Sequence, residues 1–284
     1  MTILRSALYM PGINKKAMDK ALKLDCDAVI FDLEDAVDAS RKEEARQLVK
    51  RQIENNDYAP RKVVVRVNDL NTKWGAFDVA AVANSRIQAI LLPKVSEIRD
   101  VNRMVQSLDA HESDLPLWIM VETPLAIINI NELAAHPRVA VLVMGTSDLA
   151  VDLGVQHTED RWNMDYSLQR SVLGAKAFGK KILDGVHLDF RDTNFLKSLC
   201  LQGKTLGFDG KTLIHPGQIS IANEAFSPSE ADREWAQRII EAWQLAQASG
   251  SGVVEVDGRL VESLHVDEAK RVLSAPPNRA DKKS

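Results

Sequence analysis

Cysteine and aromatic residues are scarce in this chain of 284 residues, which holds 2 cysteines and 5% aromatic residues. Cys26 and Cys200 lack the CxxC spacing and the clustered histidines of a zinc site, and two isolated cysteines cannot build a disulfide framework. We therefore expect two reduced, buried thiols in a cytoplasmic protein. The chain also lacks any apolar run of about 18 residues, which argues against a transmembrane helix.

An excess of charge of one sign is also missing, because 36 Lys and Arg residues nearly balance 40 Asp and Glu residues. A net charge of −4 favours neither nucleic acid nor a membrane surface as a partner. The opening residues 1–5 become polar too early for a signal peptide. Neither GxGxxG nor Walker spacing occurs, so no phosphate-binding loop of these types is predicted.

Short apolar runs alternate with longer amphipathic segments along most of the chain. Runs that are apolar on consecutive residues are typical of parallel strands covered on both faces. The predicted helices between them span residues 14–24, 41–55, 98–108, 127–135 and 166–178. The predicted strands are residues 7–10, 28–33, 63–67, 89–92, 117–121, 139–144, 181–186 and 213–214.

Polar residues stand directly after these strands, and their distribution favours a closed barrel over an open sheet. Strand–helix alternation alone is compatible with both architectures. An open sheet concentrates its ligand contacts at one switch point, whereas a barrel collects them from most of its strand ends. We therefore predict an α/β fold, a (β/α)8 TIM barrel. The residues that favour it are Glu34, Arg66, Lys94, Glu122, Asp148 and His215.

The pattern changes after residue 226, where a C-terminal extension of helices and a hairpin is expected. A Ser-Pro-Ser sequence introduces a helix over residues 230–248. Residues 253–256 and 259–261 flank an Asp-Gly turn and predict a hairpin, and a last helix is expected over 266–274. The predicted organisation is a barrel over 1–226, the extension over 227–275 and a disordered tail over 276–284.

Two carboxylates at successive strand ends, Glu122 and Asp148, form a candidate Mg2+ site. Mg2+ prefers oxygen ligands and is often held by one or two carboxylates, with water and substrate as further ligands. The alternative is structural, because each carboxylate could instead form a salt bridge or cap the helix that follows it. The residues alone leave both interpretations open.

Three more carboxylates fall within four residues, Asp32, Glu34 and Asp35, and such crowding is costly without compensating cations. Arg66 lies in an otherwise apolar strand and must find anionic or carbonyl partners there. It either neutralises these carboxylates or stabilises an oxyanion as a fixed donor. Both roles place Arg66 near the predicted pocket.

The order and spacing of several short motifs resemble the citrate lyase β-subunit-like branch of the HpcH/HpaI aldolase family, which includes malyl-CoA and citramalyl-CoA lyases. Each motif is weak by itself, but together they extend over nearly the whole chain. The motifs are RSALYMPG at 5–12, DLEDAV at 32–37, VRVN at 65–68, PK at 93–94, ET at 122–123, GTSDL at 145–149 and GKTLIHP at 210–216.

The resemblance implies a TIM barrel that binds an acyl-CoA thioester and Mg2+, with Glu122 and Asp148 as metal ligands. Glu34 and Asp35 would support the metal through water, and Arg66 would contact the enolate or the oxo acid. Many relatives carry Arg where Asn14 stands, which puts the phosphate contact at that position in question. The implied substrate and CoA contacts are Tyr9, Asn14, Lys20, Arg66, Glu122, Ile214 and His215.

The family's C-terminal segment usually reads Gly-Lys-Met-Ile-Asp, and its Asp serves as an acid/base that reaches into a neighbouring subunit. The corresponding residues here are 258–262, GRLVE, so the carboxylate of Glu262 is one methylene longer. The resemblance therefore implies Glu262 as a catalytic residue beside Arg66. It also implies an extension swapped between subunits of a homo-oligomer, a trimer or a hexamer. The alternative for Glu262 is an ordinary surface glutamate.

These implications predict a Mg2+-dependent carbon–carbon lyase acting on a 3-hydroxy-3-carboxyacyl-CoA. Citramalyl-CoA, malyl-CoA or a citryl thioester would be cleaved into acetyl-CoA and a 2-oxo acid. Two alternatives are open. A malyl-CoA thioesterase on the same scaffold would hydrolyse its substrate, and the β subunit of a citrate lyase complex would act on an acyl-carrier protein.

Overall fold

The computed structural model describes residues 3–248 and 250–275, and the predicted tail over 276–284 lies outside the described residues. The chain divides between Asn223 and Glu224 into two compact units. Both Cys26 and Cys200 are buried and free, as expected. Within the described ranges, no helix combines the length and the hydropathy needed to span a membrane.

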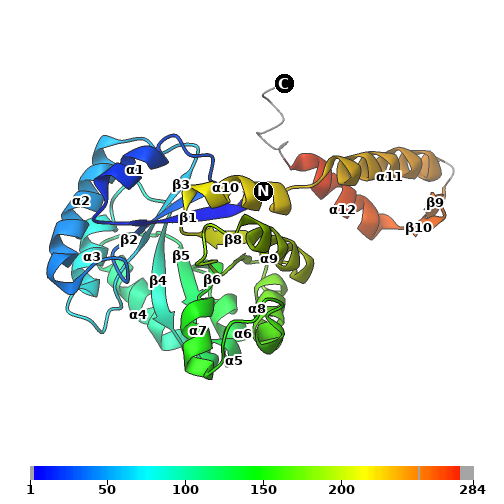
Figure 1. The fold of residues 1–284 in the computed structure, drawn as a ribbon. Helices are drawn as coiled ribbons and strands as arrows, with labels where there is room; N and C mark the ends of the chain where they lie inside the picture. The colour runs from blue at the N-terminus through cyan, green and yellow to red at the C-terminus, as the bar shows by residue number, and fades with distance from the viewer. Residues whose placement is uncertain (1–2, 249, 276–284) are drawn as a thin grey trace. The chain divides into compact units, whose positions relative to one another are not determined.

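The first unit is a closed barrel of eight parallel strands, in which each strand pairs with the next and β1 pairs with β8 (Figure 1). This arrangement confirms the predicted (β/α)8 TIM barrel. The strands are β1 (Ser6–Pro11), β2 (Ala28–Asp32), β3 (Lys62–Arg66), β4 (Ala89–Val95), β5 (Leu117–Val121), β6 (Val139–Met144), β7 (Lys181–Asp184) and β8 (Gly210–Leu213).

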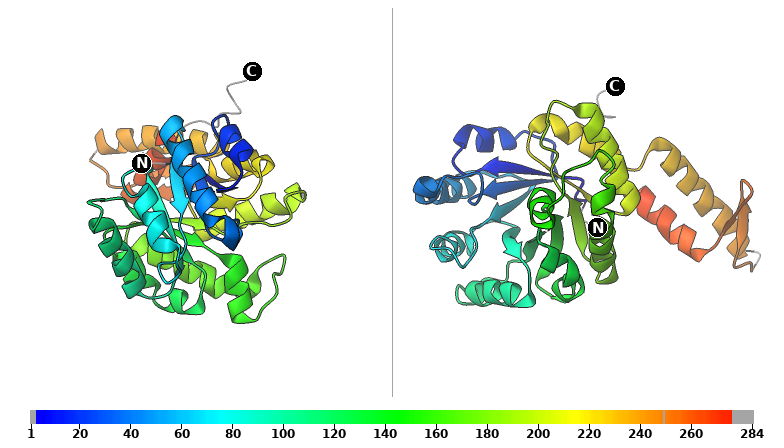
Figure 2. Two further views of the ribbon diagram at one scale, coloured as in Figure 1. Left: turned by 90° about the vertical axis from the view of Figure 1, so that its left-hand side faces the viewer. Right: turned by 60° about the horizontal axis from the view of Figure 1, so that its bottom comes forward.

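Helices surround the strands on the outside of the barrel (Figure 2). The single helix predicted over 127–135 is wrong, because two short helices occupy this region and Asn129 separates them. The Asn129 side chain donates a hydrogen bond to the carbonyl oxygen of Ser96 at 3.0 Å. The helices of this unit are α1 (Lys15–Ala21), α2 (Lys42–Asn55), α3 (Gly75–Val82), α4 (Ile98–Asp109), α5 (Pro124–Ile128), α6 (Ile130–Ala135), α7 (Thr146–Leu153), α8 (Asp165–Ala177) and α9 (Thr193–Leu206).

Alternate residues of the strands fill the barrel interior with apolar side chains, so the barrel has a packed core rather than a pore. Ala28 and Ile30 of β2 and Trp118 and Met120 of β5 are examples of this alternation. The remaining strand residues are buried beneath the helices, which explains why the strands read as continuous apolar runs. Other buried members of the interior cluster are Leu4, Ala7, Val64, Ala89, Leu91, Val141, Val143 and Leu183.

The strand β8 differs from its prediction, since it covers Gly210–Leu213 and Ile214 follows its end. All four of its residues are buried, including Lys211, whose Nζ donates to Asp184 Oδ2 at 2.8 Å. An apolar pattern cannot reveal a strand that buries a lysine through an ion pair. The same ion pair holds Asp184 at the end of β7, which stops there rather than at residue 186 as predicted.

Gly210 is the residue that lets β8 approach the chain before β1. A Cβ atom at this position would lie 2.1 Å from the carbonyl oxygen of Leu4, closer than any side chain tolerates. Glycine is unfavourable in most strands, and the predicted strand over 213–214 leaves Gly210 out. Close backbone approach at the barrel seam is the reason that it lies within a strand here.

The second unit contains α11 (Glu230–Ala248), a hairpin of β9 (Val254–Val256) and β10 (Arg259–Val261), and α12 (Ser263–Ser274). The chain enters it through α10 (Ile219–Phe226). The last helix begins at Ser263, earlier than the predicted residue 266. The unit has a small core of its own, formed by Ala236, Ile239, Val256, Val261, Val266 and Ala269.

Candidate active site

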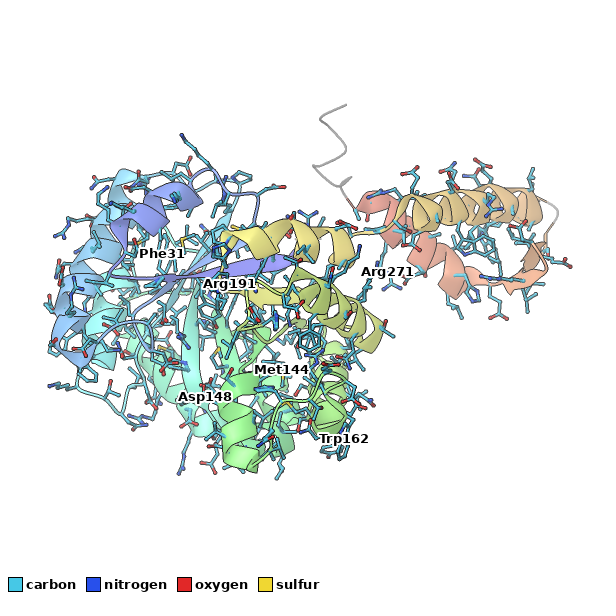
Figure 3. All side chains as sticks on the ribbon, viewed as in Figure 1. Phe31, Met144, Asp148, Trp162, Arg191 and Arg271 are labelled. Carbon is cyan, nitrogen blue, oxygen red and sulfur yellow. The ribbon has the colours of Figure 1, made fainter. Side chains whose placement is uncertain are left out.

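A cavity of about 350 Å³ lies at the carboxyl ends of the barrel strands, where barrel enzymes assemble their active sites. Its walls combine apolar side chains such as Met120 and Met144 with charged groups. Met144 ends β6, and Asp148 follows in the first turn of α7 (Figure 3). The predicted site residues that line the cavity are Tyr9, Asp35, Arg66, Asp148 and Ile214.

Arg66, the last residue of β3, forms a bidentate pair with Asp32, the last residue of β2. Its Nε and Nη2 atoms donate to the two oxygens of Asp32 at 2.7 and 2.6 Å. The parallel register places these two residues side by side, and both are buried. The oxygens of Asp32 also accept the backbone N–H groups of Glu34 and Ala36 at 2.9 and 3.1 Å. Asp32 therefore fixes both the guanidinium and the loop beside it.

The remaining side of Arg66 faces the other two carboxylates of the cluster. Its Nη1 lies 2.9 Å from Glu34 Oε2 and 3.2 Å from Asp35 Oδ2. The guanidinium also lies over the ring of Tyr9, 5.0 Å from its centroid. The structure thus shows Arg66 neutralising the acidic cluster, and it holds the guanidinium rigid at the cavity wall.

Glu34 has an unusual environment for a carboxyl group. Burial is the main reason that its pKa is raised to about 8; Arg66 opposes the shift, and Asp35 and Glu122 add to it. Its Oε2 is near Arg66 but has no partner with hydrogen-bond geometry among the described residues. A carboxyl group with a pKa near neutrality can both give and take a proton, which suits acid–base chemistry.

Glu122 and Asp148 meet around the ammonium group of Lys94. The Lys94 Nζ lies 2.9 Å from Asp148 Oδ1 and 3.7 Å from Glu122 Oε1. Glu122 follows β5 and is 1% exposed, and its Oε1 also accepts the backbone N–H of Lys94 at 2.6 Å. Burial raises the pKa of Glu122, while the positive charge of Lys94 opposes that shift.

The carboxylate pair fits a Mg2+ ion. The Oε2 of Glu122 is buried without a hydrogen-bond partner in the described structure, so one ligand oxygen is uncommitted. Lys94 already places a cation between the two carboxylates. Groups of three or more His, Cys, Asp or Glu suited to a metal are absent from the described residues. A pair with open positions is what Mg2+ needs when substrate and water complete its shell.

Gly145 separates Glu122 from the cavity. It lines the cavity, and a Cβ at this position would lie 2.4 Å from Glu122 Cβ and 2.6 Å from Glu122 Oε2. Glu122 itself is not among the lining residues, and the missing side chain at 145 is what lets its carboxylate lie directly beneath the wall. The Gly-Thr-Ser-Asp motif therefore has two roles: Gly145 leaves space for the Glu122 carboxylate, and Asp148 supplies the second carboxylate of the pair.

Several predicted contacts lie outside the cavity lining. Lys20 is exposed on α1, and Asn14 is exposed directly before this helix. The Asn14 side-chain oxygen caps the helix by accepting the Ala17 N–H at 3.1 Å. His215 follows β8, and its ring stacks on Phe190 with centroids 4.7 Å apart. Glu262 belongs to the second unit, between β10 and α12, and its reach into a neighbouring subunit stays a prediction.

A buried ion cluster behind the cavity was not predicted from the sequence. Asp184 pairs with Lys211 at 2.8 Å and with Arg161 at 2.8 Å, and all three side chains are buried. The Asp184 carbonyl also accepts the hydroxyl of Thr212, a cavity-lining residue, at 3.0 Å. The sequence feature that could have indicated this cluster is Asp184 at the end of the apolar β7 segment, with Lys211 in the following strand, β8.

Comparison with known proteins places this chain in a family. A protein-family sequence model described as HpcH/HpaI aldolase/citrate lyase matches residues 5–216. A (3S)-malyl-CoA thioesterase from Cereibacter sphaeroides is 47% identical over 95% of this chain and 93% of its own. The mitochondrial citramalyl-CoA lyase of Homo sapiens is 30% identical over 95% of this chain and 84% of its own.

A solved structure shares the architecture. The protein CitE from Mycobacterium tuberculosis, in complex with magnesium, acetoacetate and coenzyme A, matches with a TM-score of 0.78 and 28% identity. The match covers 95% of this chain and 98% of that chain. The motifs, the barrel and these relatives agree: the chain belongs to the HpcH/HpaI aldolase/citrate lyase family of enzymes.

Proposed function

We propose that this protein is a Mg2+-dependent enzyme that hydrolyses the thioester of a 3-hydroxy-3-carboxyacyl-CoA of the malyl-CoA type. The observation that supports the substrate class is that Asp148 and a rigid Arg66 guanidinium line one cavity, with the Glu122 carboxylate directly behind its wall at Gly145. A hydroxy acid thioester has an anionic end for a metal and a carbonyl oxygen for a fixed donor. The cavity offers both.

Each end of the substrate has its own partner in this proposal. Glu122 and Asp148 would hold Mg2+, which supplies Lewis-acid polarisation to the hydroxyl and carboxylate oxygens of the substrate. Arg66 would present its Nη1 edge to the thioester oxygen. Because Asp32 already fixes its Nε and Nη2 atoms, the donor needs little reorganisation as negative charge develops. A water molecule would attack the thioester carbonyl carbon and the C–S bond would break. Glu34, close to Nη1, would take a proton from the water and return it to the departing CoA thiolate.

Hydrolysis is proposed ahead of carbon–carbon cleavage because of the relative from Cereibacter sphaeroides. Its name is (3S)-malyl-CoA thioesterase, and 47% identity extends over 95% of this chain. This likeness supports the malyl-CoA thioesterase alternative. A match of this length must include most of the C-terminal unit as well as the barrel.

Carbon–carbon cleavage is the second candidate, and a specific residue favours it. The resemblance described above implies Glu262 as the acid/base carboxylate, and the human citramalyl-CoA lyase is 30% identical to this chain. In that reaction Arg66 would stabilise the acetyl-CoA enolate, and Glu262 would protonate it. The products would be acetyl-CoA and a 2-oxo acid.

Product analysis tests the proposal. Purified protein is incubated with malyl-CoA and with citramalyl-CoA, each with Mg2+ and with EDTA, and an Asp148→Asn variant serves as the control. Metal-dependent release of free CoA and the hydroxy diacid supports hydrolysis. Acetyl-CoA with glyoxylate or pyruvate identifies the lyase instead. Failure to convert either thioester contradicts both candidates.

A further inference from the structure

Lys94 has a backbone conformation that is unusual for a residue other than glycine. Its φ angle is +55°, in the left-handed region, and it lies near the end of β4. The pairing of β4 with β5 shifts register between Leu92 and Val95, so Lys94 lies inside a local irregularity of the strand. Such strain persists only where surrounding contacts impose it, and it gathers at functional sites.

This conformation directs two groups of one residue at the same carboxylate pair. The backbone N–H of Lys94 donates to Glu122 Oε1 at 2.6 Å, and its Nζ lies 3.7 Å from the same oxygen. The ammonium also contacts Asp148 Oδ1 at 2.9 Å. The main-chain contact positions Glu122, while the side chain supplies one positive charge between two negative charges.

The ammonium can leave this position, whereas the backbone contact cannot. The Lys94 side chain is 37% exposed and that of Asp148 is 47% exposed, while Glu122 is almost fully buried. A lysine stem has several rotatable bonds and reaches solvent easily from such a place. A metal ion arriving between the carboxylates would displace the Lys94 side chain without disturbing the backbone contact that holds Glu122.

We infer that Lys94 is a built-in counter-cation that occupies the metal position of the metal-free enzyme and sets the affinity for Mg2+. This inference rests on the proposed function, since it takes Glu122 and Asp148 as the metal ligands. Without metal, the ammonium prevents repulsion between the two carboxylates. When Mg2+ binds, the ammonium must leave, because two cations this close repel each other. Lys94 therefore weakens metal binding by competition.

Calorimetric titration with MgCl2 tests the inference on the metal-free full-length protein. Replacing Lys94 with Met removes the competing charge, and we expect the Kd for Mg2+ to fall roughly tenfold, given the strength of a partly screened charge interaction at about 4 Å. Lys94→Arg keeps the charge and should stay near the wild-type Kd. Lys176→Met is the matched control and should leave the Kd for Mg2+ unchanged. The Lys176 side chain is 44% exposed, and its Nζ lies 2.7 Å from Asp209 Oδ2.

Two further variants keep the outcomes separate. Lys94→Gly also removes the ammonium group, and glycine adopts the left-handed backbone conformation without strain. Its Kd for Mg2+ therefore tests the same inference if the Met variant folds poorly. A Met or Gly variant that binds Mg2+ no tighter than wild type, while Glu122→Gln abolishes binding, overturns the counter-cation role and leaves the metal site intact. If the Glu122→Gln and Asp148→Asn variants both bind Mg2+ with the wild-type Kd, the inference and the proposed metal site are overturned together.

Discussion

The guanidinium of Arg66 and the carboxylate of Asp32 form a buried bidentate pair, with hydrogen bonds of 2.7 and 2.6 Å between adjacent strand ends. Removing the charge of Asp32 takes away the bidentate partner of a buried guanidinium and leaves Arg66 with its Nη1 contacts to Glu34 and Asp35 alone. The pair also aligns Arg66 toward the cavity, because the Asp32 oxygens fix two of its three nitrogens. Stability and catalysis should therefore both depend on Asp32.

We expect Asp32→Asn to lower the free energy of unfolding by about 3–5 kcal/mol, the usual cost of breaking a buried ion pair. The kcat of the surviving folded protein should fall roughly a hundredfold, since an error of about 1 Å in a positioned group has this effect. Urea unfolding and steady-state kinetics measure the two effects. A variant with wild-type kcat would show that Arg66 needs no support from Asp32.

Arg66→Lys keeps the charge but loses the fork that engages Asp32 through two nitrogens. We expect kcat to fall by about two orders of magnitude, because one donor of this kind contributes about 10²–10³ to rate. Binding of Mg2+ should change little, since Glu122 and Asp148 stay intact. Equal losses of metal binding and kcat would mean that the substitution disturbs the whole cavity.

Gly145→Ala tests whether Glu122 needs the open position above it. The added Cβ would lie 2.4 Å from Glu122 Cβ, so the glutamate must move. We expect Mg2+ affinity, measured by titration, to fall at least tenfold with the barrel still folded. Gly252→Ala is the control, because no atom lies within 4 Å of its added Cβ. Unchanged Mg2+ affinity in the Gly145→Ala variant would show that Glu122 is not a metal ligand.

Asp184 should make the barrel sensitive to acid. Burial alone would raise its pKa, but Lys211 and Arg161 outweigh burial and lower it. A lowered carboxyl pKa adds stability above the unfolded pKa of about 4, and this stability is lost as pH falls toward the folded pKa. The stability difference between wild type and Asp184→Asn should be about 3–5 kcal/mol at neutral pH and shrink below about pH 4.

Urea unfolding at a series of pH values measures this difference. Asp257→Asn is the control, since Asp257 is 56% exposed in its pair with Arg238, and surface pairs of this kind contribute about 0–1 kcal/mol. A stability difference that stays constant from neutral to acidic pH would show that the charge of Asp184 is not the source of its contribution.

The sequence was sufficient to predict the barrel because seven of its strands are recognisable apolar runs and polar residues follow most of them. β8 was misplaced because its burial depends on the Lys211–Asp184 ion pair, which no apolar pattern encodes. The partners of Arg66 were predictable, since adjacent strands of a parallel barrel end at the same edge. The position of Lys94 was not, because it depends on a left-handed φ angle that lysine rarely adopts.

Closure of the barrel between β1 and β8 has a consequence for how the protein folds. Tyr9 and Ile214 line one cavity although most of the barrel sequence separates them. Contacts so distant in sequence form slowly, because a long loop must close before they add any stability. During synthesis β1 leaves the ribosome long before its partner β8 exists. The cavity therefore cannot be complete before β8 has been synthesised. A nascent or truncated chain that lacks β8 and the residues after it would have an open sheet edge and would lack Thr212 and Ile214 of the cavity lining.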